Sequence, residues 1–450
     1  MKCVVGIDLG STTTKAVLLD DRGAILGRGI TNSRSNYEVA CSVARIEAIT
    51  SARLDLLERA LGGAEASTVL PRLREAFRLE LYLADLEDLK KTLLGHASQA
   101  PLHQRKALEG AAKHVLDVIE RNSPALFLSG SPRKSAFFRD LAGAAFVAEA
   151  EHLATKGEAR FEPLVALYDR AILEVETRMR PHDTRRLLLR ALRWLEADGT
   201  IAHLRPSIVQ AIDAATSQRI EEATVVGTGY GRQTLPFPKE AVRSEILCHG
   251  RGAHRSFGGT RTVLDIGGQD TKAIQVDGQG VVTSFQMNDR CAAGCGRYLG
   301  YIADELNLGL HELGPLALRA KKPVKVNSTC TVFAGAEIRE RLALGQQRED
   351  ILAGLHRAIM LRAMSLLARS GGVRDELTFT GGVCNNPMAT KILRELVDEN
   401  YGTDITLNIH PDSIYMGALG AALFALDDLR AGRVGELPNF IRMHHTEAVA

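Results

Sequence analysis

Net charge is almost absent from this sequence of 450 residues, because 56 lysines and arginines face 54 aspartates and glutamates and leave a formal charge of +2. This balance gives no basis for binding to nucleic acid or to another polyanion. Cysteine is also scarce, with 7 residues scattered along the chain. An odd number of cysteines in a long chain does not fit a disulfide framework, so we expect a reducing compartment.

Long apolar runs and a leader segment are missing as well. No apolar run approaches the ~20 residues that a membrane helix needs, and no signal peptide precedes the first expected strand. We therefore expect a cytoplasmic protein without a membrane partner. The length suggests two to three domains, and 45% apolar with 24% charged residues is typical of a globular chain.

Chemically informative sequence first occurs in a turn near the N-terminus. An apolar stretch at residues 3–9 contains Asp8 and is followed by Gly10-Ser11-Thr12-Thr13-Thr14-Lys15, after which strand-like sequence resumes. Small residues let backbone N–H groups close around phosphate oxygens, hydroxyl groups add donors, and Lys15 adds positive charge. The turn is a candidate phosphate site, with a plain Ser/Thr-rich hairpin turn as the alternative.

Helical periodicity dominates residues 40–222. Apolar residues recur there at three- and four-residue steps, and alanine, leucine, arginine and glutamate are in excess. The histidines of this region show no metal-ligand spacing. The pattern predicts a long helical segment that carries no recognisable chemistry.

A second copy of the N-terminal pattern follows this helical segment. An expected strand at 262–266 contains Asp265 and leads into the turn Gly267-Gly268-Gln269-Asp270-Thr271-Lys272, and two further expected strands complete the hairpins. An internal duplication of this kind predicts two like domains that face each other across a nucleotide.

A third glycine turn, Gly381-Gly382-Val383-Cys384-Asn385, lies between an expected strand at 376–380 and an expected helix at 388–399. A Gly-Gly pair in this place allows the close approach of a flat ligand such as an adenine ring. A simple tight turn between strand and helix explains the residues equally well.

Cys291 and Cys330 each follow residues of helix-capping type and precede helix-compatible sequence. This context would place both thiols at helix N-termini, where backbone N–H groups and the helix dipole favour a thiolate or an anionic metal–sulfur cluster. Two cysteines are half of the four that an iron–sulfur cluster normally takes, so a second subunit is the obvious supplier of the others. The alternative is a pair of buried, incidental thiols.

The three turns together carry a resemblance. Asp8–Lys15, Asp265–Lys272 and Gly381–Asn385 resemble the phosphate-1, phosphate-2 and adenosine motifs of the actin/sugar-kinase/heat-shock-70 ATPase fold. With the Cys291 and Cys330 motifs, the chain resembles the BadF/BadG/BcrA/BcrD ATPase family. That family includes activators of 2-hydroxyacyl-CoA dehydratases and the ATPase subunits of ATP-dependent benzoyl-CoA reductases.

The resemblance implies an α/β fold with duplicated ribonuclease-H-like (actin-like ATPase) domains and a long all-helical insertion. Residues 1–39 and 223–260 would form the first ATPase subdomain, interrupted by the insertion at 40–222. Residues 261–412 would form the second subdomain, which contains both cysteine motifs. Residues 413–450 would form a C-terminal helix that packs back on the first subdomain, followed by a tail.

The resemblance also implies roles in binding ATP with Mg²⁺. Asp8 and Asp265 would position Mg²⁺ through water, since magnesium keeps much of its hydration shell. Gln269 and Asp270 would orient the attacking water. The residues expected to contact the nucleotide are Gly10, Ser11, Thr12, Thr13 and Lys15 at the first turn, Gly267 and Gly268 at the second, and Gly381, Gly382 and Asn385 at the third, with Glu337 a weaker candidate for the ribose.

By the same resemblance, Cys291 and Cys330 would bind a [4Fe–4S] cluster shared with a homologous subunit. ATP hydrolysis would drive electrons from reduced ferredoxin through that cluster to two ring-reducing, substrate-binding subunits. Cys295, where dehydratase activators usually have Thr, and the long insertion both resemble the larger ATPase subunit of benzoyl-CoA reductase, which pairs with a smaller homologue.

Other interpretations stay open at this point. Cys295 could be an alternative ligand, although packing is favoured, and Cys384 is expected to be structural. The main functional alternative is an ATP-dependent activator of a 2-hydroxyacyl-CoA dehydratase. A small-molecule kinase of the same fold and a non-enzymatic scaffold built on the helical insertion are the others.

Overall fold

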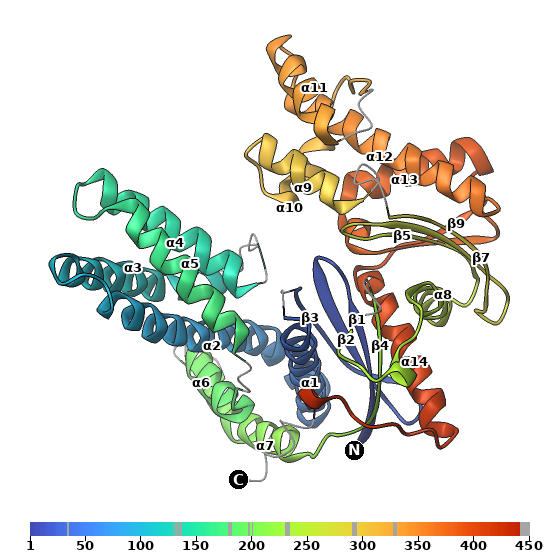
Figure 1. Cartoon of the computed structure of the whole chain (residues 1–450). Coiled ribbons are helices and arrows are strands. Elements are labelled where there is room, and N and C mark those ends of the chain that lie inside the picture. The colour runs from blue at the N-terminus through green and yellow to red at the C-terminus, as the bar shows by residue number, and fades with distance from the viewer. Residues whose placement is uncertain are drawn as a thin grey trace. The chain divides into compact units, whose positions relative to one another are not determined.

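The computed structural model describes residues 1–33, 36–128, 130, 135, 137–178, 182–196, 199, 201–229, 235–289, 295–326 and 331–441 (Figure 1). Contacts divide the chain into two units. The first unit contains Met1–Ile49 and Ile220–Ala450, and the second contains Thr50–Arg219.

A four-stranded sheet with the order β3-β2-β1-β4 forms one half of the first unit. β1 (Lys2–Leu9), β2 (Thr13–Asp20) and β3 (Ile25–Asn32) form an antiparallel meander, and β4 (Glu221–Gly229) lies parallel to β1. Every residue from Cys3 to Leu9 is buried, because β1 lies inside the sheet and packs on both of its faces.

A five-stranded sheet with the order β7-β6-β5-β8-β9 forms the other half. Here β5 (Thr260–Ile266), β6 (Thr271–Val276) and β7 (Val282–Asn288) form the meander, β8 (Glu376–Thr380) lies parallel to β5, and β9 (Thr406–Asn408) extends the sheet. The two sheets repeat one plan, a three-stranded meander with a parallel strand beside its first strand. The predicted duplication of ribonuclease-H-like halves is confirmed.

Two central helices join these halves. α14 (Met416–Arg430) packs on the first sheet, whereas α8 (Glu245–Ser256) packs on the second, and the two helices contact each other (Figure 1). Glycines allow this contact, since a Cβ at Gly420 would stand 1.9 Å from the Cys248 carbonyl oxygen and one at Gly252 would stand 2.0 Å from that of Met416. Backbone therefore meets backbone at the helix crossing.

The other face of the second sheet is covered by helices. These are α9 (Gly296–Glu305), α10 (Leu310–Ala317), α11 (Thr331–Ala343), α12 (Arg348–Ser370) and α13 (Pro387–Tyr401), and they share one core with Leu264 and Phe379 of the sheet. By length and composition alone α12 is apolar enough to cross a membrane, which the sequence analysis did not predict. However, 67% of its apolar window is buried inside this core. A core helix passes the same test.

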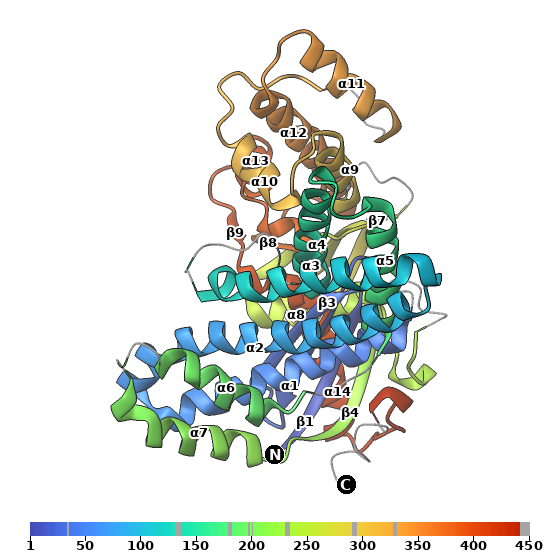
Figure 2. The same ribbon diagram turned by 90° about the vertical axis from the view of Figure 1, so that its left-hand side faces the viewer.

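The second unit is helical in the part that the structure describes. Its helices are the end of α1 (Tyr37–Leu61), then α2 (Gly63–Ser98), α3 (Leu102–Leu128), α4 (Phe138–Thr155), α5 (Phe161–Thr177), α6 (Thr184–Glu196) and α7 (Arg205–Ser217). Figure 2 shows the long helix α2 running beside both α3 and α6. One end of α2 packs with α3, α4 and α5, and the other packs with α6 and α7. The predicted helical insertion is confirmed.

Candidate functional site

Strand register places the two predicted turns in equivalent positions. Asp8 lies opposite Lys15 across β1 and β2, and Asp265 lies opposite Lys272 across β5 and β6. Residues directly opposite in an antiparallel pair point to the same face of the sheet. Each hairpin therefore presents one carboxylate and one ammonium group beside a turn of small residues.

The first turn is tight, and its lysine is available. A Cβ at Gly10 would stand 2.7 Å from the Thr13 carbonyl oxygen and 3.4 Å from Lys15 Nζ, so the lysine lies over the turn. Ser33 holds this turn in place through two hydrogen bonds. Its hydroxyl donates to the Gly10 carbonyl oxygen at 2.5 Å, and its backbone N–H donates to the Thr12 carbonyl oxygen at 2.8 Å. Half-buried Lys15 makes no ion pair with any residue that the structure describes.

The second turn faces the first turn directly. A Cβ at Gly268 would stand 2.0 Å from Thr12 Oγ1 and 3.3 Å from Ser11 Oγ. The turn is closed by the Gly267 N–H, which donates to the Asp270 carbonyl oxygen at 2.9 Å. The structure thus brings together two predicted phosphate turns that are far apart in sequence, and only a residue without a side chain fits at Gly268.

Buried carboxylates converge beside these turns. Asp8 is 5% exposed, Asp265 2%, Asp270 7% and Glu245 5%. Lys272 Nζ donates to Asp270 Oδ1 at 2.8 Å and to Asp265 Oδ2 at 3.2 Å, and lies 3.9 Å from Glu245 Oε2. Thr380 Oγ1 donates to Asp265 Oδ1 at 2.8 Å. The single ammonium group of Lys272 therefore lies within ion-pair distance of three carboxylates.

This arrangement sets the ionisation of the cluster. Burial alone would raise the pKa of Asp265, but His249, Lys272 and the Thr380 hydroxyl outweigh it and hold that pKa below its usual range. Burial lowers the pKa of Lys272, yet Asp265, Asp270 and Glu245 reverse this effect and raise it. Burial also raises the pKa of Glu245, and Asp270 adds to the rise. The surroundings thus shift Glu245 toward its protonated form and Asp265 toward its charged form.

His249 was missed by the sequence analysis, although it bridges the two halves of the site. Its Nε2 lies 3.8 Å from Asp8 Oδ2, and its Nδ1 lies 3.3 Å from Asp265 Oδ1 in a direction that makes no hydrogen bond. Space for it depends on Gly417 at the start of α14, where a Cβ would stand 2.8 Å from His249 Nε2 and 2.6 Å from Asp8 Oδ2. The signal in the sequence was the small-residue face of α8, which marks a buried helix and hence a buried histidine.

The third turn closes the same edge of the second sheet. Gly381 follows β8 with φ +83°, and a Cβ there would stand 2.3 Å from the Ile266 carbonyl oxygen, so glycine is required by both conformation and space. A Cβ at Gly382 would meet nothing within 4 Å, and Asn385 is exposed. Gly382 and Asn385 therefore border open space.

Two other predicted residues differ in their surroundings. Gln269 is half-buried in the second turn, next to the paired Asp270. Glu337 lies on α11, where Arg341 Nη2 donates to its Oε1 at 3.0 Å. The suggested role of Glu337 at the ribose stays a prediction.

Cys291 and Cys330, the predicted cluster ligands, lie outside the described residues. α11 begins at Thr331, directly after Cys330, as expected. Residues 290–294 also lie outside the described residues, and the next described helix, α9, begins at Gly296 with fully buried Cys295 as its N-cap. The backbone of Cys295 is extended (φ −135°, ψ 176°).

The start of α9 is attached to the second turn. The backbone N–H of Gly296 donates to the Gly267 carbonyl oxygen at 2.8 Å, and that of Arg297 donates to the Gly268 carbonyl oxygen at 2.7 Å. These bonds use N–H groups that a helix N-terminus leaves without partners inside the helix. A shift of the Gly267–Gly268 turn would consequently move the start of α9.

The carboxylate cluster offers oxygen ligands that suit a divalent cation. Asp265 and Asp270 contact the ammonium group of Lys272, whereas Asp8 makes no ion pair with any described lysine or arginine. In the described part of the chain, no group of three His, Cys, Asp or Glu side chains is placed to hold a metal ion directly. Mg²⁺ often binds through one or two carboxylates and keeps several waters, so Asp8 and Asp265 fit a hydrated Mg²⁺ that arrives with phosphates.

Comparison with known proteins identifies the family of this chain. The model of the BadF/BadG/BcrA/BcrD ATPase family matches residues 5–425. The (R)-2-hydroxyglutaryl-CoA dehydratase activating ATPase of Acidaminococcus fermentans is 40% identical over 219 residues, 49% of this chain and 81% of that protein. The 2-hydroxyisocaproyl-CoA dehydratase activator of Clostridioides difficile is 40% identical over 207 residues, 46% of this chain and 74% of that protein. One of the benzoyl-CoA reductase subunits of Thauera aromatica is 36% identical over 214 residues, 47% of this chain and 74% of that protein.

Replacement of Lys272 tests the electrostatics of the cluster. Lys272→Met should lower the free energy of unfolding by about 3–5 kcal/mol at pH 7, because it leaves buried carboxylates without their cation. The lowered pKa of Asp265 stabilises the intact protein at neutral pH, and this contribution is lost as pH falls through the folded-state value. The difference between the two proteins should therefore persist down to about pH 4, the ordinary range of an aspartate, and shrink below it in urea unfolding experiments.

Lys15→Met is the matched control, since Lys15 occupies the equivalent register without an ion pair to a described residue. It should cost about 1 kcal/mol or less. Equal losses in the two variants would contradict the paired state of Lys272.

Proposed function

Because the chain belongs to the BadF/BadG/BcrA/BcrD ATPase family, we propose that it hydrolyses ATP to drive low-potential electrons toward an acyl-CoA-reducing enzyme. The observation that carries the proposal is the meeting of the Gly268 turn with the Ser11–Thr12 turn beside Asp8 and Asp265. Phosphoryl transfer asks mainly for positioning and for stabilisation of charge, and this arrangement offers both.

The two turns would hold the phosphates of ATP from opposite sides. Backbone N–H groups of Gly10–Thr13 and the ammonium group of Lys15 would bind from the first sheet, and Gly267 and Gly268 from the second. The different surroundings of Lys15 and Lys272 support the proposal that only the first turn offers a lysine to the phosphates. Lys272 is occupied by carboxylates, so Lys15 is the lysine available for a phosphate.

Asp8 and Asp265 would position Mg²⁺ through its waters, and the bound ion would neutralise charge on the phosphates. Gln269 and Asp270 are the candidates to orient the attacking water. Gln269 is the better one, because the Asp270 carboxylate is held by Lys272 at 2.8 Å. On the nucleoside side, Gly381, Gly382 and Asn385 would meet the base, with Glu337 the weaker candidate for the ribose.

The attachment of α9 suggests how hydrolysis would reach an iron–sulfur cluster. Cys291 and Cys330 would supply two of the four thiolates of a [4Fe–4S] cluster, and a homologous subunit would supply the others. The Gly267–Gly268 turn holds the first N–H groups of α9, the helix that follows Cys291. A change of the turn on hydrolysis would therefore alter the surroundings of Cys291, and hydrogen bonds and solvent exposure at the sulfurs set the reduction potential.

The finer assignment is the larger ATPase subunit of an ATP-dependent benzoyl-CoA reductase. Cys295 and the long helical insertion support it, because both resemble that branch of the family. The partners would then be a smaller homologous ATPase subunit, two ring-reducing subunits that bind the acyl-CoA, and reduced ferredoxin as the electron donor.

A dehydratase activator is the second candidate. Sequence identity favours it, since the activators of Acidaminococcus fermentans and Clostridioides difficile are each 40% identical to this chain, against 36% for the reductase subunit. An activator would use the same ATP site and the same cysteines, but it would pair with a second copy of itself and meet its dehydratase transiently.

Asp8→Asn tests the nucleotide site. Loss of the carboxylate that orients hydrated Mg²⁺ should slow ATP hydrolysis by at least about a hundredfold and leave iron content unchanged. The exposed Asp404→Asn variant carries the same change of charge and should hydrolyse ATP at the normal rate. Normal turnover by Asp8→Asn in a phosphate-release assay would refute the site.

Cysteine variants test the cluster ligands. Cys291→Ser and Cys330→Ser should each abolish the iron and acid-labile sulfide of anaerobically purified protein, because the remaining thiolates cannot complete the site. Cys384→Ala should retain full iron, since burial raises the pKa of that thiol to about 12 and keeps it protonated. Full iron content in the Cys330→Ser protein would exclude its role as a ligand.

Anaerobic purification of the native complex separates the two candidates. A reductase subunit should co-purify with three other proteins, with one four-iron cluster for each pair of unlike ATPase subunits. An isolated homodimer with one cluster would instead identify an activator. A colourless protein without iron would rule out both.

A further inference from the structure

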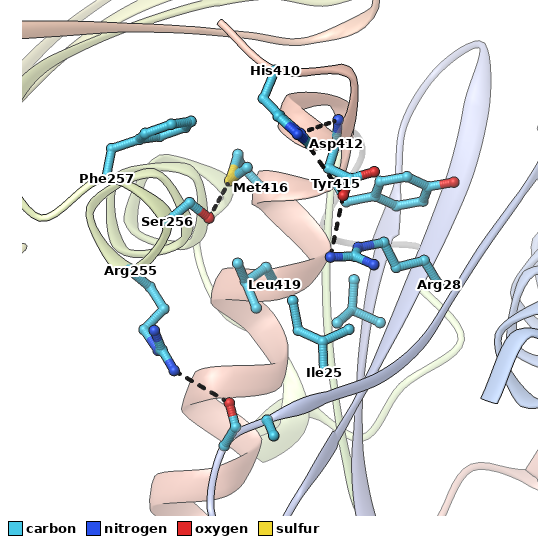
Figure 3. A pocket seen from close by; sticks show the side chains of 13 residues that line it. Ile25, Arg28, Arg255, Ser256, Phe257, His410, Asp412, Tyr415, Met416 and Leu419 are labelled. Carbon is cyan, nitrogen blue, oxygen red and sulfur yellow. Dashed lines mark hydrogen bonds and ion pairs between the residues drawn. The ribbon is translucent and has the colours of Figure 1, made fainter. Parts of the chain in front are cut away.

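A cavity of about 400 Å³ lies away from the carboxylate cluster, between the β2–β3 hairpin, the end of α8 and the start of α14 (Figure 3). The last turn of α8 and the connection from it to β5 contribute Arg255, Ser256 and Phe257 to its wall. The connection from β9 to α14 contributes His410, Asp412 and Tyr415. After β4 the chain passes between the two sheets twice, once through each of these segments. Both segments line the cavity.

The cavity has a positive rim. Arg28 Nη2 lies 3.2 Å from Asp412 Oδ2, so its charge is largely balanced. Arg255 makes no ion pair with any residue in the described ranges, and its Nη2 donates there only to the Gly23 carbonyl oxygen, at 3.5 Å. The backbone N–H of Asp412 donates to His410 Nδ1 at 3.1 Å. With His410 neutral, the lining carries one unbalanced positive charge, that of Arg255.

The floor of the cavity is apolar. Ile25 and Leu419 lie between the two arginines, which enter from β3 and from the end of α8 (Figure 3), and Val17 and Met416 also line the cavity. Phe257 and Tyr415 add aromatic surface. An apolar floor with a few polar groups at the rim is the usual composition of a small-molecule site, and a volume of roughly 300–1,000 Å³ is typical.

We propose that this cavity binds a small organic carboxylate with an apolar body. Arg255 would anchor the carboxylate, because a guanidinium group can donate two parallel hydrogen bonds to it. The body would lie on Ile25 and Leu419. A phosphate ester would leave the apolar floor in contact with water, and a neutral hydrocarbon would leave Arg255 unused.

The position of the cavity couples it to the carboxylate cluster. Met416 lines the cavity, and the next residue, Gly417, is the one that packs against Asp8 and His249. A ligand held between the two connecting segments would favour one arrangement of the sheets over another. By thermodynamic linkage, it would change the affinity for nucleotide by the same factor by which nucleotide changes the affinity for the carboxylate. The inference does not depend on which acyl-CoA enzyme the chain serves.

Calorimetric titration of the full-length chain with 4-phenylbutanoate tests the proposal. The carboxylate should bind, while acetate, which lacks the body, and 4-phenylbutan-1-ol, which lacks the charge, should each bind at least about tenfold more weakly. Arg255→Gln should weaken binding of 4-phenylbutanoate about tenfold.

Arg261→Gln is the matched control. Arg261 lies six residues along the chain, lines no part of the cavity, and among the described residues donates only to the backbone carbonyls of Gly258 and Thr260. Its replacement should leave the affinity unchanged. Failure of 4-phenylbutanoate to bind, or equal weakening in both variants, would overturn the site.

The coupling has its own measurement. The affinity for 4-phenylbutanoate should change at least about threefold when a non-hydrolysable ATP analogue is present, and the affinity for the analogue should change by the same factor. An unchanged affinity in a chain that binds both ligands would refute the coupling.

Discussion

Buried negative charge at the meeting of the two sheets constrains the rest of the first unit. Asp8, Asp265, Asp270 and Glu245 are each less than a tenth exposed, and unpaired carboxylates are costly in such surroundings. Lys272 relieves part of this cost by contacting three of the four. Under the proposed function, hydrated Mg²⁺ and the phosphates of ATP would bring further partners to these carboxylates.

Close backbone contacts keep these charged groups in place. Gly252 and Gly420 let α8 and α14 cross without intervening side chains, and Gly417 leaves room for His249 between Asp8 and Asp265. Larger residues at these points would force the helices apart and separate the two halves of the site. The glycines of α14 thus serve the geometry of the carboxylates as well as the packing of the core.

The sequence predicted those parts of the structure that are determined by residues close together in the chain. The alternation of strand and turn gave both hairpins, and the repeated Asp–turn–Lys order placed each carboxylate opposite its lysine. It did not predict the full difference between Lys15 and Lys272: Asp270 lies only two residues from Lys272, but Glu245 reaches Lys272 only after folding. His249 was missed for the same reason. Nor could the sequence predict that the start of α9 is held by Gly267 and Gly268, because these hydrogen-bond partners of Gly296 and Arg297 lie far away in the sequence.

Lys272 contacts carboxylates, whereas Lys15 makes no ion pair with a described residue, so the two copies of the hairpin would have different roles. In the second copy Lys272 contacts carboxylates, so under the proposed function this turn would bind phosphate through its backbone and could pass a displacement to α9. The first copy keeps its lysine clear of ion pairs within the described chain, so that lysine can follow the charge of a phosphate as the charge changes during hydrolysis. A site with two such lysines would bind phosphate more strongly, but its carboxylates would then lack a permanent cation. On this view, the lysine of the second sheet always contacts carboxylates, whereas the lysine of the first sheet would contact a phosphate whose charge changes during hydrolysis. Hydrolysis could then alter the contact between the two sheets.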